Sequence, residues 1–142
     1  MRIADILRSK GNSVATVSPS ATLADLIGEL ARYNVGALPV VDDGGRLVGI
    51  VSERDVVRQL HQHGPEVLGA PIVDFMTATV TTCSPSDKVA DLARVMTTGR
   101  FRHLPVVVDG SLAGIVSIGD LVKARIDLLE SEREQLQSYI AG

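Results

Sequence analysis

The chain has 142 residues, a formal net charge of -3 and 45% hydrophobic residues, but only two Tyr, two Phe and no Trp. This length fits one compact domain or two small halves that share an aliphatic core, and the composition excludes a disordered chain. No apolar run approaches the roughly 18 residues of a membrane-spanning helix, and the charge balance provides no basic surface for nucleic acid. We therefore expect neither a membrane nor a nucleic acid as a partner.

The start of the chain and its cysteine content indicate a cellular compartment. Asp5 places a charge within the first residues, and no apolar segment with a small-residue cleavage site accompanies it. Cys83 is the single cysteine, so an intrachain disulfide is impossible and a reducing compartment fits best. The sequence therefore predicts a cytoplasmic protein.

The first predicted elements are a lead-in helix and one α/β repeat. Residues 1–13 form the lead-in, with Ile3, Ile6 and Leu7 on its apolar side and Gly11-Asn12 at its end. The first repeat, residues 14–63, begins with a β-rich run that is stopped by Ser-Pro, because proline removes a hydrogen-bond donor. Its later elements are a helix through residues 23–31, strands at 37–41 and 47–51 around the turn Asp42–Arg46, and a helix that starts near Ser52.

A connector, residues 64–79, separates this repeat from a second one at residues 80–125. The second repeat has the same order of elements, again with apolar helix positions three and four residues apart. These elements are a β-rich run at 80–83, a helix through residues 89–96, strands at 103–108 and 112–116, and a helix that starts near Ser117.

The two repeats are also similar residue by residue. Thr16–Leu26 reappears 66 positions later as Thr82–Leu92, and Leu38-Pro-Val-Val41 returns at the same offset. Gly49-Ile-Val-Ser and Asp55 match Gly114-Ile-Val-Ser and Asp120 after the loss of one residue in a turn. The order β-α-β-β-α, present twice, predicts an α/β (α+β) fold of two pseudo-symmetric halves whose sheets are covered by helices on one face.

The last helix is predicted to run past the second repeat, to about Tyr139, so that residues 126–142 form a C-terminal extension. An apolar seam follows this helix among charged residues, which is typical of a helix that packs against a partner. The seam consists of Val122, Ile126, Leu129, Leu136 and Ile140.

Thr-x-Ser-Pro, hydrophobic-Pro-Val-Val, Gly-Ile-Val-Ser and Ser-x-x-Asp occur in this order in both copies. The chain thereby resembles a tandem pair of cystathionine β-synthase (CBS) domains, a Bateman module, over nearly its whole length. Gly99–Val106 and Ser117–Val122 look like a stand-alone subgroup of these proteins, some of which bind AMP or NAD. The resemblance implies two pseudo-symmetric clefts for adenosyl ligands such as AMP, ADP, ATP, NAD or S-adenosylmethionine, and it does not choose among them.

Each Ser-x-x-Asp segment has a structural and a functional interpretation. Ser52 and Ser117 suit helix N-caps, and Asp55 and Asp120 suit the position that completes a capping box. The same geometry offers free backbone donors to a phosphate and a carboxylate to the two hydroxyls of a ribose. The residues alone favour capping, whereas the resemblance favours ribose binding by the two aspartates.

Arg100, Arg102 and His103 precede the second Leu-Pro-Val-Val, where the first copy has Asn34, Gly36 and Ala37. They fit either an exposed basic strand edge or a phosphate-binding group. In the family, each cleft combines strand residues of one repeat with the Ser-x-x-Asp segment of the other. The resemblance thus implies one cleft near Thr82, Arg102, His103, Pro105, Ser52, Arg54 and Asp55, and a less cationic second cleft near Thr16, Ala37, Pro39, Ser117, Gly119 and Asp120, which is expected to bind weakly or stay empty.

Other chemistry has little support. His61 and His63 are two residues apart, which does not place them on one helical face, and Cys83 has no paired ligand nearby, so no metal is expected. Cys83 fits a small buried hydrophobe, with contact to an adenine edge as the alternative. No phosphate-binding loop or nucleophile-base-acid series stands out.

The sequence therefore predicts a non-enzymatic regulatory module. It would bind AMP, ADP, ATP or NAD, form a homodimer and act on an unidentified protein in trans through a ligand-dependent conformational shift. One alternative is a dimerising or protein-interaction scaffold that works without a ligand. A small nucleotide-hydrolysing enzyme is the third possibility, for which the sequence supplies no acid-base pair.

Overall fold

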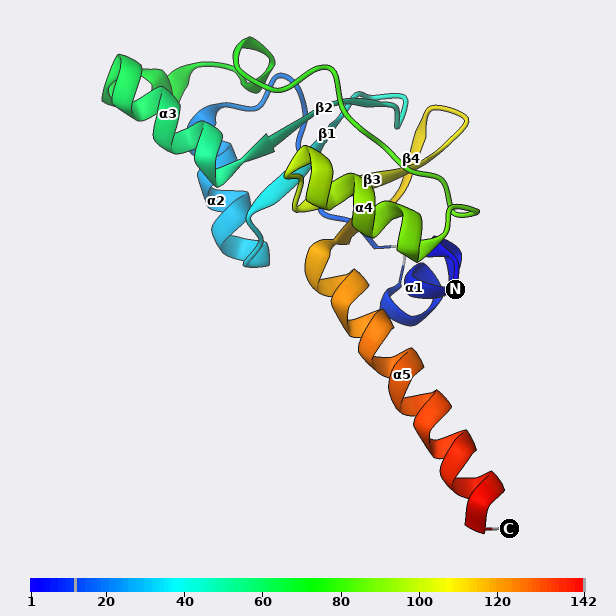
Figure 1. Cartoon of the computed structure of the whole chain (residues 1–142). Coiled ribbons are helices and arrows are strands. Elements are labelled where there is room, and N and C mark those ends of the chain that lie inside the picture. Colours follow the sequence, from blue (N-terminus) through cyan, green and yellow to red (C-terminus); the bar gives the residue numbers. More distant parts are fainter. Residues whose placement is uncertain (12, 142) are drawn as a thin grey trace.

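The computed structural model of the protein describes residues 1–11 and 13–141. Asn12 and Gly142, which belong to the predicted lead-in and C-terminal segments, lie outside the described residues. The elements, labelled in Figure 1 where there is room, are α1 (Ile3–Lys10), α2 (Leu23–Tyr33), β1 (Ala37–Val41), β2 (Leu47–Ser52), α3 (Glu53–His63), the 3-10 turns η1 (Pro65–Gly69) and η2 (Ile72–Asp74), α4 (Val89–Gly99), β3 (His103–Val108), β4 (Ser111–Ser117) and α5 (Ile118–Ala141). The order helix, hairpin, helix occurs twice, which confirms the mixed fold of two repeats.

Each repeat is centred on an antiparallel β-hairpin. In the first, Pro39 lies opposite Ile50, and in the second, Pro105 lies opposite Ile115. The turns use a positive φ at Gly45 (80°) and at Gly110 (81°), as turn chemistry at these positions predicts. Both hairpins match the strands predicted from the sequence to within one residue.

The short β-rich runs before each Ser-Pro are strands over a single residue only, which corrects the prediction of strands at 14–17 and 80–83. Val17 donates its N–H to the carbonyl of Pro39 (3.0 Å) and accepts from Val41 (3.0 Å), so it forms one parallel bridge with β1. Cys83 forms the equivalent bridge with β3. The residues before Val17 and Cys83 do not continue this pairing, because at both places the chain crosses from one repeat to the other.

The segment that precedes each repeat packs into the core of the other repeat. Ile3 of α1 is fully buried in the second core, which also contains Met96 and Val116, while Ile72 of η2 is fully buried in the first core. The backbone contacts match as well: the Ile3 N–H donates to Asp87 and the Ile72 N–H donates to Ala21. The lead-in and the connector are therefore parts of the two cores rather than appendages.

Two glycines permit this exchange of segments. A Cβ on Gly114 of β4 would lie 2.7 Å from Leu7 of α1, and a Cβ on Gly49 of β2 would lie 2.6 Å from Met76. Such distances are too short for packed carbon and sulfur atoms, so a side chain at either position would push the incoming segment away.

The hairpin turns join the two repeats at one end of the molecule. Leu47 donates its N–H to Gly110 (3.3 Å) and Leu112 donates its N–H to Gly45 (3.4 Å), a pair of contacts related by the pseudo-twofold axis. From the second repeat, α5 runs away from the body and carries the C-terminus clear of it (Figure 1). In the described part of the chain, no helix combines the length and apolarity that crossing a membrane requires.

Candidate functional site

A cleft of about 550 Å³ lies between the two repeats. The first repeat supplies the start of β1, part of β2 and the N-terminal turn of α3, and the second supplies the segment before Cys83 and the chain that enters β3. The lining residues are Gly36, Ala37, Ile50, Ser52, Glu53, Arg54, Asp55, Arg58, Thr77, Thr79, Val80, Thr81, Arg100, Phe101, Arg102 and His103.

Ser52 and Asp55 form a capping box at the start of α3. The backbone N–H and the hydroxyl of Ser52 donate to Oδ2 of Asp55 (2.8 and 3.1 Å), and the Asp55 N–H donates to Oγ of Ser52 (3.3 Å). No hydrogen bond reaches Oδ1 of Asp55 from any residue that the structure describes. The structural and functional interpretations are thus compatible, because capping occupies one carboxylate oxygen and leaves the other available.

The cleft carries an excess of positive charge. Its lining holds four arginines, contributed by both repeats, against the carboxylates of Glu53 and Asp55. Among the described residues, no ion pair involves any of these arginines. Guanidinium groups with unused donors are suited to phosphate, which they can bind through two parallel hydrogen bonds. The four are Arg54, Arg58, Arg100 and Arg102.

His103, at the first position of β3, is half-buried in the cleft wall. Burial lowers the pKa of His103 below its usual 6.5, and the positive charges of Lys10 and Arg102 lower it further, while Asp120 opposes them. The imidazole is therefore neutral at pH 7 and offers one hydrogen-bond donor and one acceptor.

The cleft also has an apolar wall. Phe101, which is 39% exposed, lines the cleft together with Val80, Ile50 and Ala37. The Phe101 ring packs on Gly99 so closely that a Cβ there would overlap the ring. Apolar and aromatic surface of this kind suits the faces of a nucleobase.

Five residues expected in the first cleft do line it together: Ser52, Arg54, Asp55, Arg102 and His103. Two others do not line it, since Pro105 is buried inside β3 and Thr82 is exposed one residue before the Cys83 bridge. Ala37, which was expected in the second cleft, lines this one because the start of β1 lies beside Ser52.

Sequence reasoning missed Arg58 and the segment Thr77–Thr81. Arg58 is four residues after Arg54, a spacing that puts both side chains on one face of α3, so the helical period was a usable signal. The Thr77–Thr81 segment had no usable sequence signal. Thr77 is held there by two backbone hydrogen bonds with Ile50 (3.0 Å each), and backbone hydrogen bonds do not depend on the type of side chain.

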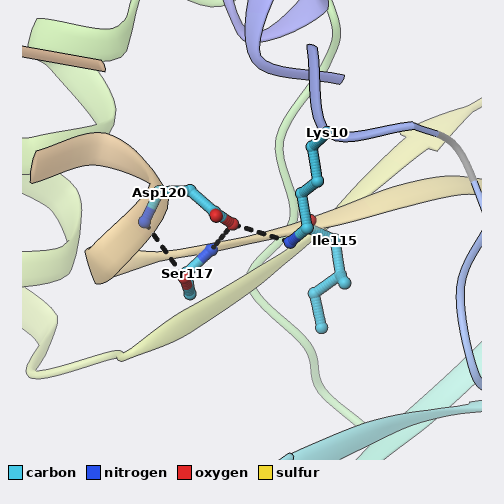
Figure 2. Close-up of polar contacts among 4 residues, drawn as sticks. All are labelled: Lys10, Ile115, Ser117 and Asp120. Atoms are coloured by element: carbon cyan, nitrogen blue, oxygen red, sulfur yellow. Dashed lines mark hydrogen bonds and ion pairs between the residues drawn. The ribbon is translucent and has the colours of Figure 1, made fainter. Parts of the chain in front are cut away.

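The second Ser-x-x-Asp segment is engaged by a lysine from α1 (Figure 2). Lys10 Nζ lies 2.7 Å from Oδ2 of Asp120 and donates to the carbonyl of Ile115 (2.9 Å). Ser117 and Asp120 form the same capping box as their counterparts in the first repeat, with bonds of 2.9 and 3.1 Å. Burial raises the pKa of Asp120, but hydrogen bonds from Lys10 and Ser117 outweigh it and hold that pKa below its usual value.

In the second repeat, the side chain of Lys10 makes the hydrogen bond that the backbone of Thr77 makes in the first repeat. The Ile50 carbonyl accepts from the Thr77 N–H, whereas the carbonyl of its counterpart, Ile115, accepts from the Lys10 ammonium. The two Ser-x-x-Asp segments are therefore alike in sequence and different in their surroundings.

Neither the main cleft nor the smaller cavity beside Asp120 gathers all the residues that were expected in the second cleft. Asp120 lines a cavity of about 270 Å³ with Lys10, but Ser117 and Gly119 do not line it. Pro39 is fully buried in β1 and Thr16 is exposed. The second cleft therefore stays a prediction, and Lys10 of α1 contacts Asp120 where a ligand was expected.

Cys83 lies in the second core and does not line the cleft, as expected for a small buried hydrophobe. Burial raises the pKa of the Cys83 thiol to about 12, with a further contribution from Asp87. The thiol is thus protonated at physiological pH, and the alternative of an adenine contact has no support.

Two pseudo-symmetric α/β repeats with a charged cleft between them define a paired ligand-binding module. The family to which the chain belongs is the CBS domain family, whose sequence model matches residues 3–62 and 72–127. The resemblance recognised in the sequence is thereby confirmed.

The chain is similar to several proteins along most of its length. CBS domain-containing protein CBSX3, mitochondrial, from Arabidopsis thaliana is 35% identical over an alignment of 99% of this chain and 72% of that protein. The crystal structure of the CBS-domain containing protein ATU1752 from Agrobacterium tumefaciens has a TM-score of 0.83 and 40% identity, over 88% of this chain and 99% of that one. Because the Arabidopsis protein is named as mitochondrial, the cytoplasmic location stays a prediction.

Two further solved relatives contain adenosyl ligands. CBSX2 was crystallised in complex with AMP and matches 89% of this chain and 97% of its own, with a TM-score of 0.76 and 31% identity. The CBS domain pair of protein MJ0100 was crystallised with 5′-methylthioadenosine and S-adenosyl-L-methionine; it matches 87% of this chain and 94% of its own, with a TM-score of 0.74 and 26% identity.

Proposed function

We propose that the cleft between the repeats binds one adenosyl ligand that carries phosphate, and that the protein is a regulatory sensor of AMP, ADP, ATP or NAD. The observation that carries this proposal is the meeting, in one cleft of about 550 Å³, of a capped carboxylate, four arginines without ion pairs among the described residues, and an apolar wall. Complexes of two family members with adenosyl compounds support the choice of ligand class.

Each part of the ligand has a matching group. The free Oδ1 of Asp55 accepts hydrogen bonds from the ribose hydroxyls, as carboxylates do in other nucleotide sites. Arg54 and Arg102 contact phosphate from opposite repeats, and the positive end of the α3 dipole adds to their attraction. Phe101 and Val80 cover the adenine.

The charge of the cleft favours phosphate-bearing ligands within the adenosyl class. Its four arginines outnumber the two carboxylates, so a nucleotide with one or more phosphates gains attraction there. S-adenosylmethionine carries a positive sulfonium next to its ribose and would be repelled. The preferred ligands are therefore AMP, ADP, ATP and NAD, and the order among these four is for experiment to decide.

One ligand per chain follows from the contrast between the two Ser-x-x-Asp segments. Asp120 already binds Lys10, and the cavity beside it is about half the volume of the main cleft. A ribose at Asp120 would have to displace the ammonium and would lose that ion pair.

Regulation follows from the position of the ligand between the repeats. A ligand that contacts both repeats favours one relative orientation of them, and a homodimer carries this change to a partner in trans. The residues that bind ligand support no reaction step, so we propose a binding module in the cytoplasm rather than an enzyme.

A thermal-shift screen tests the proposal. AMP, ADP, ATP and NAD are compared with adenosine, which shares the adenine and ribose but lacks phosphate, and with S-adenosylmethionine. A ligand at about 100 times its Kd adds about 2.7 kcal/mol of stability, so at least one of the four nucleotides raises Tm by several degrees and adenosine does so much less. No shift with any nucleotide at millimolar concentration would instead support a scaffold that acts without a ligand, which the exposed apolar face of α5 also allows.

A further inference from the structure

The C-terminal part of α5 stands free of the rest of the molecule. The helix contacts α1, α4 and β4, and among the residues that the structure describes its buried ones, Leu121 and Ala124, lie in its first turns. From Leu129 to Ile140 every residue is exposed, and the helix projects away from the body in Figure 1. A helix without tertiary contacts has marginal stability in water, so we expect a partner to cover this segment.

One face of α5 is apolar along its length. The spacing of its apolar residues alternates between three and four, with one Arg in the series, which aligns them in a single stripe directed away from the buried side of the helix. We call this stripe the α5 seam: Val122 is 52% exposed, Ile126 49%, Leu129 49%, Leu136 63% and Ile140 83%.

The α5 seam has the pattern of a coiled coil of two strands. Ile126, Arg133 and Ile140 occupy the first position of successive heptads, and Val122, Leu129 and Leu136 occupy the fourth. Among parallel coiled coils, Ile at the first position with Leu at the fourth favours two strands, and a single polar or charged residue at a first position specifies the register at a cost in stability. We propose that the α5 seam pairs with the α5 seam of a second copy in a parallel two-stranded coiled coil.

Charge determines the orientation of the two helices. Arg125 and Glu130 flank the seam at the positions that meet across a parallel dimer, so each Arg125 faces Glu130 of the second copy, twice per dimer. An antiparallel pairing of the same stripe would instead place Glu132 beside Glu132 of the second copy. At these flanking positions the parallel arrangement has attraction where the antiparallel one has repulsion; inside the parallel seam, Arg133 faces Arg133 of the second copy at a cost in stability.

The charge of the tail also argues against a membrane surface as the occupant. Between residues 126 and 140 the chain has Asp127, Glu130, Glu132 and Glu134 against Arg133 alone. An acidic helix is repelled by anionic lipids, whereas helices that lie on membranes are rich in Lys and Arg.

The dimer itself is tested by sedimentation of the full chain without nucleotide. The pair Leu129→Glu and Leu136→Glu places charges in the seam, and the matched pair Ser131→Glu and Ser138→Glu places the same charges on the opposite face. The wild type and the Ser pair sediment as dimers, and the Leu pair as a monomer. A wild-type monomer at tens of micromolar, or equal masses for the two variants, would overturn the proposal.

Orientation is tested by crosslinking and by charge exchange. Leu136→Cys forms a covalent dimer on mild oxidation only if the two helices are parallel, and Cys83 does not compete because it is buried with its pKa raised to about 12. Arg125→Glu and Glu130→Arg each raise the dimer Kd roughly tenfold, and the double variant restores it. A dimer without the crosslink, or without restoration, overturns the parallel arrangement.

This proposal specifies the surface of the homodimer that the proposed function includes. Its experiments need no nucleotide, and the nucleotide screen needs no dimer. A failure of one is thus distinguishable from a failure of the other.

Discussion

Lys10 and Thr77 show how one residue can separate two similar sites. The carbonyls of Ile50 and Ile115 are at equivalent positions in the two hairpins. Thr77 donates its backbone N–H to the first, whereas Lys10 donates to the second from its charged side chain, which also contacts Asp120. Asp55 has no ion pair of this kind among the described residues. At this scale, a single ammonium group explains why we assign the ligand to one cleft.

Replacing Lys10 tests the strength of its contact with Asp120. Lys10→Met removes a half-exposed ion pair and a hydrogen bond, so we expect a loss of about 1 kcal/mol at pH 7. Because folding depresses the pKa of Asp120, this stabilisation is fully present well above the usual pKa of 3.8 and is lost as the pH falls through the depressed value. Urea unfolding at pH 7 and at pH 3 measures both effects.

Lys123→Met is the control, since Lys123 lines the same small cavity without a recorded bond to Asp120. The difference between wild type and Lys10→Met should shrink at the lower pH, and that between wild type and Lys123→Met should not. A Lys10→Met difference that is equal at both values would show that Lys10 acts through packing alone.

His103 reports on phosphate in the cleft. Burial and the neighbouring cations lower its pKa in the free protein, so a bound phosphate, being negative, should raise that pKa. An NMR titration of the imidazole with and without saturating nucleotide measures the change, and the exposed His61 provides the internal reference. An upward shift confined to His103 is expected, and an unchanged pKa would place the phosphate elsewhere.

The hairpins were predictable because their information is local. Apolar runs on either side of Asp42–Arg46 and Asp109–Ser111 determine both strands and both turns. The Ser52 and Asp55 capping box was equally readable, since the two residues lie three positions apart and bond to each other. Elements of this kind need no knowledge of the rest of the fold.

The exchange of segments between the repeats was not predictable from local patterns. Ile3 contacts a core built from residues far along the chain, and Lys10 meets Asp120 across 110 positions. One sequence signal exists: Ile3-Ala-Asp resembles Ile72-Val-Asp, the other exchanged segment, at an offset that differs from that of the repeats. A similarity of three residues is too short to predict, from the sequence alone, that the two segments pack at equivalent places.

The importance of α1 as an element is testable by truncating Ile3. Ile3→Ala removes a fully buried side chain and should cost roughly 2–5 kcal/mol of unfolding free energy, as should Ile72→Ala at the equivalent place. Ile27→Ala, at a position 36% exposed on α2, should cost well under half as much. Chemical denaturation compares the three variants. If Ile3→Ala were no more costly than Ile27→Ala, α1 would not be part of the second core.

At the scale of the whole molecule, the proposed ligand site and the proposed dimer contact are separate: the cleft lies between the repeats, and the α5 seam lies on the C-terminal helix. The cleft draws residues from both repeats, so its occupancy reports on how the repeats are oriented. The α5 helix starts at Ile118, directly after Ser117 ends β4, and therefore links the orientation of the second repeat to the proposed dimer contact. In the proposed function, a ligand that shifts the repeats would thus act on the proposed interface through α5.

Isothermal titration of the wild type, Asp55→Ala and Asp120→Ala with AMP, ADP, ATP and NAD is the most direct test of the proposed cleft. The wild type should bind one nucleotide per chain. Asp55→Ala removes charge-assisted hydrogen bonds to the ribose and should weaken binding at least tenfold, whereas Asp120→Ala should change it less than about twofold. Two nucleotides per chain, or the same loss of affinity in both variants, would contradict a single cleft beside Ser52 and Asp55.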